Sequence, residues 1–115
     1  MKILLSVTLS LLLLFTSCNK NKTDNLATLK KLYNTYKNGE ISECTYNGET
    51  VYSASLNAND AGSSVFDADG KNIGDCNWAW GGVDAICGEV KNCKRIYCVD
   101  NNIWGYDYVD EYDLD

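Results

Sequence analysis

The residues of this sequence with the clearest chemistry are its cysteines. The chain of 115 residues holds six, and five of them follow residue 40: Cys44, Cys76, Cys87, Cys93 and Cys98. In an oxidising compartment cysteines are normally paired, and five thiols allow at most two intrachain disulfides. We expect two structural disulfides and one buried spare cysteine, and the spacing leaves the pairing open. The alternative for the spare thiol is a reactive or intermolecular role.

The sixth cysteine, Cys18, ends an apolar N-terminal run. Met1-Lys2 opens the chain, and the apolar stretch over residues 3–15 is too short to span a bilayer as a helix. A basic start, a short apolar core and small residues after it are typical of a secretory signal. Phe15-Thr16-Ser17-Cys18 resembles the lipobox of bacterial lipoprotein signals, with Phe15 where leucine is usual. From this resemblance we predict that the chain is cleaved before Cys18 and that Cys18 is acylated, with palmitate among its acyl chains. Several acyl chains on one residue anchor a protein stably to a membrane.

This interpretation divides the chain into three parts. Residues 1–17 are the expected signal peptide, residues 18–23 the lipidated cysteine with a polar tether, and residues 24–115 a single α+β domain. The domain is expected outside the cytoplasm, in the bacterial cell envelope, with the outer membrane favoured. The alternative is an ordinary signal or an N-terminal anchor, with Cys18 in a disulfide.

Composition argues against several classes of function. Histidine is absent, which excludes the Ser-His and Cys-His arrangements and histidine-based acid/base catalysis. No CxxC pair is present, and disulfides compete with zinc for thiols. The net charge of −6 argues against a basic patch for nucleic acid or anionic lipid head groups. We therefore expect no enzyme activity, no metal, no cofactor and no nucleic-acid partner.

Two aspartates in Asp67-Ala68-Asp69-Gly70 resemble the start of a calcium loop. An EF-hand loop needs further oxygen ligands at alternating positions and a glutamate at the twelfth. Counting from Asp67, the fifth residue is Lys71 and the twelfth is Trp78. Because Asp-Gly supplies the positive φ that a hairpin requires, we predict a turn instead.

Aromatic residues are the candidates for ligand binding. Trp78 and Trp80 lie in a glycine-rich stretch that we expect to be a loop, and four more aromatic residues occupy even-numbered positions of the tail: Trp104, Tyr106, Tyr108 and Tyr112. Asp107, Glu111, Asp113 and Asp115 take odd-numbered positions, and alternation at period two predicts a strand with one aromatic face. That face either packs on the sheet as an extra strand or, where uncovered, binds a ligand.

The remaining patterns predict the elements that position these residues. Leu26 and Leu29 begin an apolar stripe at helical spacing, with Thr23 or Asp24 as cap. Asn47-Gly48 between two β-rich runs is a strong hairpin signal. In chain order we predict an amphipathic helix over 23–38, strands over 43–46, 50–56, 63–66 and 71–76, a short helix over 83–93 and a core strand over 94–99. The expected fold is α+β, with an antiparallel sheet of about four to six strands built from two hairpins and stapled by disulfides.

Two motifs carry a resemblance. Tyr46-x-Gly48-x-x-Val51-Tyr52 and Val65-Phe66-Asp67-Ala68-Asp69-Gly70-x-x-Ile73, followed by Cys76, resemble a domain of small uncharacterised lipoproteins from Gram-negative anaerobes. The resemblance covers roughly residues 41–82 and implies a secreted lipoprotein domain. It implies no activity and no catalytic residue.

Together these features predict a lipid-anchored envelope protein that binds a protein or a glycan through its aromatic groups. Tryptophan and tyrosine side chains carry much of the energy of interfaces, and they also stack on sugar rings. Two alternatives remain open at this stage. One is a small thiol-active protein that uses the unpaired cysteine, and the other is a secreted hydrolase inhibitor that presents a disulfide-held loop such as 87–98.

Overall fold

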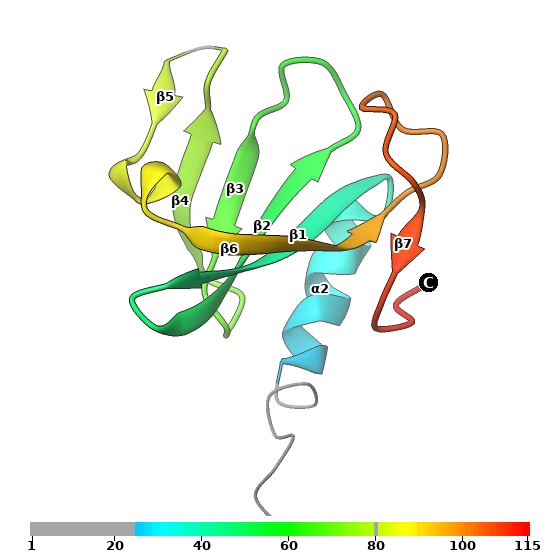
Figure 1. Ribbon diagram of the computed structural model, residues 1–115, viewed down its shortest axis with the longest axis horizontal. Helices are drawn as coiled ribbons and strands as arrows, with labels where there is room; N and C mark the ends of the chain where they lie inside the picture. The colour runs from blue at the N-terminus through cyan, green and yellow to red at the C-terminus, as the bar shows by residue number, and fades with distance from the viewer. Residues whose placement is uncertain (1–24, 80) are drawn as a thin grey trace, which may run out of the picture.

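The computed structural model describes residues 25–79 and 81–115. This part of the chain contains one α-helix, one 3₁₀ helix and seven strands (Figure 1). In chain order they are α2 (Leu26–Tyr36), β1 (Gly39–Tyr46), β2 (Glu49–Leu56), β3 (Ser63–Phe66), β4 (Asn72–Asn77), β5 (Gly82–Val83), η2 (Ala85–Gly88), β6 (Lys91–Cys98) and β7 (Val109–Asp110). The strands form one antiparallel sheet in the order β5-β4-β3-β2-β1-β6-β7. The architecture is therefore α+β.

Both predicted hairpins are confirmed. β1 and β2 pair in register up to Tyr46 and Glu49, and the two residues between them have the positive φ angles, 51° and 79°, that a tight hairpin turn requires. β3 and β4 are joined by the second turn, where the Asp67 carboxylate accepts hydrogen bonds from the backbone N–H groups of Asp69 and Lys71. Asp67 thus serves the turn, as the sequence predicts.

The sheet has an apolar cluster on each face. Val51 and Tyr52 are neighbours on β2 and must point to opposite faces. Tyr52 belongs to the cluster under α2, while Val51 belongs to the cluster under η2. Val65 and Phe66 divide between the same two clusters. One face is therefore covered by the helix and the other by the segment around η2.

α2 packs through its apolar stripe and is tied down at both ends. Leu29 and Leu32 are buried in the cluster with Tyr52, and burying each leucine contributes about 1.5–3 kcal/mol. The Thr28 hydroxyl donates to the carbonyl of the β3–β4 turn at 2.7 Å, and the Tyr97 hydroxyl donates to the carbonyl just after the helix at 2.6 Å. The helix lies within the predicted range 23–38, and the expected caps Thr23 and Asp24 lie outside the described residues.

The opposite face differs from the prediction. The helix expected over 83–93 is wrong, because only the 3₁₀ turn η2 forms, between β5 and β6. Asp84 is held against β4, since its carboxylate accepts the Asp75 N–H at 2.8 Å and its own N–H donates to the Asp75 carbonyl at 3.0 Å. Ile86 then covers the sheet over Gly74, where a Cβ would collide with the Ile86 side chain. Strand pairing from residue 91 onward ends any helix.

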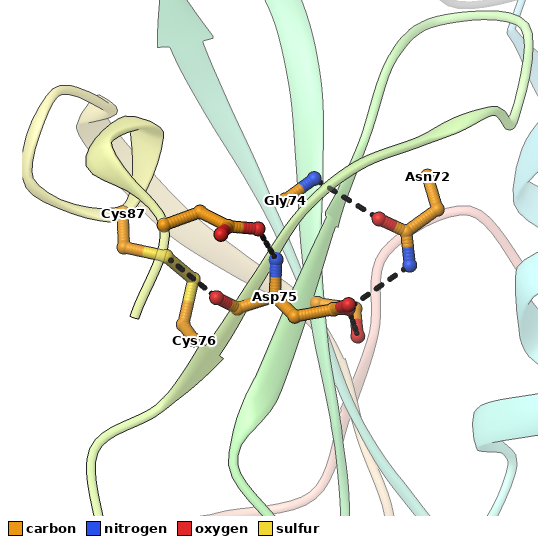
Figure 2. The surroundings of a disulfide bond; sticks show 7 residues. Asn72, Gly74, Asp75, Cys76 and Cys87 are labelled. Carbon is orange, nitrogen blue, oxygen red and sulfur yellow. Dashed lines mark hydrogen bonds between the residues drawn. A yellow bond between two sulfur atoms is a disulfide. The ribbon is translucent and has the colours of Figure 1, made fainter. Parts of the chain in front are cut away.

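Two disulfides staple these layers. Cys44–Cys93 joins β1 to β6, and Cys76–Cys87 joins β4 to η2. Figure 2 shows the second bridge beside β4, with the Asp75 carbonyl 3.4 Å from the Cys87 sulfur. Cys98 is unpaired and buried. The expectation of two bridges and one buried spare cysteine is confirmed for the part of the chain that the structure describes.

The sheet has more strands than the predicted four to six because two short edge strands, β5 and β7, extend it. The long aromatic strand predicted for the tail is wrong, since only Val109–Asp110 pairs with β6. The Asn102 side chain binds backbone groups of Val99, Trp104 and Tyr106 and curls the chain into a loop. Gly105, with φ of 75°, also interrupts the extended conformation. Local turn chemistry therefore overrides the alternating pattern.

Candidate binding site

Three loops gather at one end of the sheet. Because all neighbouring strands are antiparallel, the ends of β2, β4 and β6 lie at the same edge, and the loops that follow them share it (Figure 1). Trp78 follows β4, and Trp104 lies in the loop between β6 and β7. α2 begins at the opposite end. The topology thus brings two of the predicted binding residues to one end of the molecule.

These loops enclose a shallow depression with a volume of about 370 Å³. Trp78, Ile103 and Trp104 are the large apolar residues of its lining, while Asn59, Asp60 and Ser63 of the β2–β3 region are among its polar lining residues. The Trp78 side chain is 67% exposed and Ile103 is 49% exposed. Large apolar groups gathered in an exposed hollow are typical of an interaction site.

The β6–β7 loop is held in place by Asn102. Its amide nitrogen donates to the carbonyls of Val99 and Tyr106, both at 2.8 Å, and its amide oxygen accepts from the backbone N–H groups of Trp104 and Tyr106. The next residue ties two loops together, because the Ile103 N–H donates to the Asn57 side chain at 2.8 Å. The part of the apolar lining that Ile103 and Trp104 supply is therefore fixed before any ligand arrives, which lowers the entropic cost of binding.

Trp104 forms a stack with two other side chains, Tyr106 and Arg95. The Trp104 and Tyr106 rings are stacked, with centroids 5.8 Å apart and 23° between their planes. The Arg95 guanidinium lies 3.6 Å from the centroid of the Tyr106 ring, within cation–π range. Arg95 also forms an ion pair with Glu40 at 3.4 Å. The stack thus connects Trp104 to strands β6 and β1.

The other sequence candidates lie elsewhere. Tyr108 is 49% exposed and does not line the depression. Tyr112 packs against the core under α2, and its hydroxyl donates to the Glu43 carboxylate at 2.9 Å. Burial and the Glu43 hydrogen bond raise the pKa of Tyr112, so this side chain belongs to the fold. Trp80 and Cys18 lie outside the described residues.

Sequence reasoning missed several residues of the depression and its support: Asn59, Asp60, Ser63, Arg95, Asn102 and Ile103. The Asn59-Asp60 pair is recognisable in the sequence only as turn material. Asn102 carried a usable signal, since asparagine side chains commonly bind nearby backbone groups in turns. Nothing local indicated that this loop would meet the β2–β3 loop.

A larger depression, of about 590 Å³, lies at the other end of the sheet. It is lined by Asn25 and by the turns of both hairpins, with the carboxyl-bearing side chains Glu49, Asp67 and Asp69. Across residues 25–79 and 81–115, no group of three or more histidine, cysteine or acidic side chains is arranged to hold a metal ion. This end of the domain is where the described chain begins.

The spare cysteine is poorly suited to thiol chemistry. Cys98 has no exposed surface, and burial, together with the Glu40 charge, raises the pKa of its thiol. Thiolate, the reactive form, is therefore disfavoured. The Asn102 amide donates to its sulfur at 3.3 Å, which gives the thiol a structural role. The prediction of a disulfide-held loop over 87–98 is also wrong, because Cys87 pairs with Cys76.

Comparisons with protein-family models, with curated proteins and with solved structures found no match to this chain. The resemblance to small lipoproteins of Gram-negative anaerobes therefore stays a prediction. The structure also contains, in residues 25–79 and 81–115, no helix with the length and apolar character needed to cross a bilayer.

Proposed function

We propose that this protein is a lipid-anchored, non-catalytic binding module of the bacterial cell envelope, and that it holds its ligand in the depression between Trp78 and Trp104. One observation carries the proposal. Two tryptophans from separate loops line the same exposed hollow, and hydrogen bonds hold the loop that carries Trp104 in place.

The exposure of these side chains supports binding. Trp78 keeps two thirds of its surface in water, although covering apolar surface is favourable by about 25 cal/mol for each Å². Covering the Trp78 side chain with a ligand therefore contributes favourably to the free energy of binding. Aromatic side chains of this kind dominate the energy of many interfaces.

The polar lining supports binding without catalysis. Asp60 is the one ionisable side chain among the described residues that line the depression. Glycoside hydrolysis needs two carboxyl groups that flank the scissile bond, and acyl transfer needs a nucleophile with an adjacent base. Neither arrangement occurs among these lining residues.

The segment that carries the proposed anchor joins the described domain at the end opposite this depression. The described chain begins at Asn25, beside the β1–β2 and β3–β4 turns, and the aromatic loops lie at the other end of the sheet (Figure 1). Cys18 precedes Asn25 by seven residues, a chain length of at most about 25 Å. Lipid on Cys18 holds the hairpin end near the membrane and leaves the depression accessible from the other side.

Metabolic labelling with a palmitate analogue tests the anchor. The full chain is expected to incorporate label and sediment with membranes, and Cys18→Ala is expected to lose both properties. A Cys18→Ala chain that still carries label contradicts lipidation at this residue.

Screening the lipidated protein in detergent against defined oligosaccharides and peptides tests the binding site. We expect a ligand whose affinity falls at least tenfold in Trp78→Ala and in Trp104→Ala. Tyr108→Ala is the matched control, because it removes an exposed aromatic ring outside the depression. A ligand that binds both tryptophan variants as tightly as the wild type contradicts the site.

A further inference from the structure

We propose that the depression takes an uncharged carbohydrate chain, with sugar rings against Trp78 and Trp104 and hydroxyl groups bound by Asn59 and Asp60. This inference rests on the proposed function and specifies the class of ligand. It follows from the combination of side chains, the charge around them and the shape of the surface.

The lining combines flat aromatic surface with short polar side chains. Trp78 and Trp104 offer indole rings, and Asn59, Asp60 and Ser63 offer amide, carboxylate and hydroxyl groups within the same hollow. A pyranose ring has an apolar face of C–H groups and a rim of hydroxyl groups. Indole rings match the first, and a carboxylate or amide oxygen accepts hydrogen bonds from the second. A purely apolar ligand leaves the polar lining groups without partners, which costs free energy.

Among carbohydrates, the charge around the depression favours a neutral chain over an acidic one. No lysine or arginine is found among the described residues that line it, and Asp60 places a carboxylate there. Arg95, which supports the aromatic stack, is engaged by the Tyr106 ring and by Glu40. A phosphate, sulfate or uronate group therefore meets a carboxylate and finds no free cation. An acidic polysaccharide is excluded on this ground.

The shape of the surface disfavours a protein partner. The depression, of about 370 Å³, falls within the range of small-ligand pockets, about 300–1,000 Å³. Peptides can also bind by adding a strand to a sheet edge. Both edge strands here, β5 and β7, are only two residues long, so they offer few backbone groups for such pairing.

Tyr106 and Arg95 act as positioning residues in this site. Tyr106 stacks on one part of the Trp104 indole ring, and the ligand contacts the part that Tyr106 does not cover. Arg95 holds the far side of Tyr106. We expect Arg95→Met to weaken binding severalfold by loosening Trp104, and Arg95→Lys, which keeps a cation over Tyr106, to restore part of the affinity.

The test is titration of the lipidated protein in detergent with neutral β- and α-linked hexasaccharides, polygalacturonate fragments and a peptide library. Tryptophan fluorescence and calorimetry report binding. We expect saturable binding of a neutral glycan that falls at least tenfold in Trp78→Ala and Trp104→Ala, and more modestly in Asp60→Asn. Asp60 has φ of 59°, a conformation that asparagine tolerates, so this variant is expected to fold. Tyr108→Ala is expected to bind like the wild type.

Other outcomes overturn the inference in distinguishable ways. Equal or tighter binding of the acidic fragments refutes the charge argument. A peptide that requires both tryptophans, with no glycan bound, refutes the carbohydrate assignment and leaves the binding site intact. Absence of any ligand in all three sets overturns the inference and the proposed function together. Near-ultraviolet circular dichroism of each variant confirms that the fold is retained.

Discussion

Removal of the two disulfides should destabilise the domain by different amounts, because they close chain segments of different length. Cys44 and Cys93 are 49 residues apart, whereas Cys76 and Cys87 are 11 apart and lie inside the larger loop. The inner bridge shortens the path between the outer pair to about 40 residues, for which loop-closure entropy gives about 4 kcal/mol. The inner loop alone gives about 3 kcal/mol.

The assay compares Cys44→Ala/Cys93→Ala with Cys76→Ala/Cys87→Ala by urea unfolding under oxidising conditions. Both double variants carry Cys98→Ala in addition, so that the spare thiol cannot exchange with the remaining bridge, and Cys98→Ala alone is the reference. For a domain of this size each kcal/mol lowers Tm by about 4–8 °C. We expect the unfolding free energy to depend more steeply on urea in both variants, because the unfolded chain is more expanded when a bridge is missing.

Two results refute this reasoning. Loss of less than about 1 kcal/mol in both variants shows that loop closure contributes little here. A larger loss for the inner pair than for the outer pair shows that packing of η2 against β4, rather than chain entropy, sets the contribution of Cys76–Cys87. Measuring both variants against the same reference separates these explanations.

Three further predictions concern the core. Gly74→Ala should lower the free energy of unfolding by about 1–3 kcal/mol, because its Cβ collides with the Ile86 side chain of η2. Gly88→Ala is the control, since its Cβ meets nothing within 4 Å. Equal free energies of unfolding for the two variants contradict the collision. Burial raises the pKa of Tyr52 to about 12, so the unfolded chain ionises first, and the stability from this group is complete below about pH 10 and lost as pH rises through 12. Absorbance at 295 nm and circular dichroism followed together should show this phenolate forming only as the fold is lost; ionisation near pH 10 in the folded state rules it out. Cys98 should resist thiol reagents in the native protein and react after unfolding, as mass spectrometry will show, and rapid native labelling contradicts its burial.

The sequence by itself determines the local turns of this protein. Asn47-Gly48 and Asp67 to Gly70 make hairpins because positive φ angles and side-chain bonds to nearby backbone depend on those residues alone. The number of disulfides could also be predicted from the sequence, since five thiols form at most two intrachain bridges. The alternating tail shows where such reasoning ends. Its pattern predicts a long strand, but Asn102 captures four backbone groups and bends the chain.

Tertiary structure alone decided which distant residues meet. Cys44 and Cys93 become neighbours because β6 crosses to pair with β1, a non-local contact that no spacing rule indicates. Trp78 and Trp104 line one depression because antiparallel order places the ends of β4 and β6 at the same edge of the sheet. Local sequence patterns determine contacts between residues that are close in the chain. The site depends instead on the order of the strands, and the chain reaches that order only when it buries both faces of the sheet.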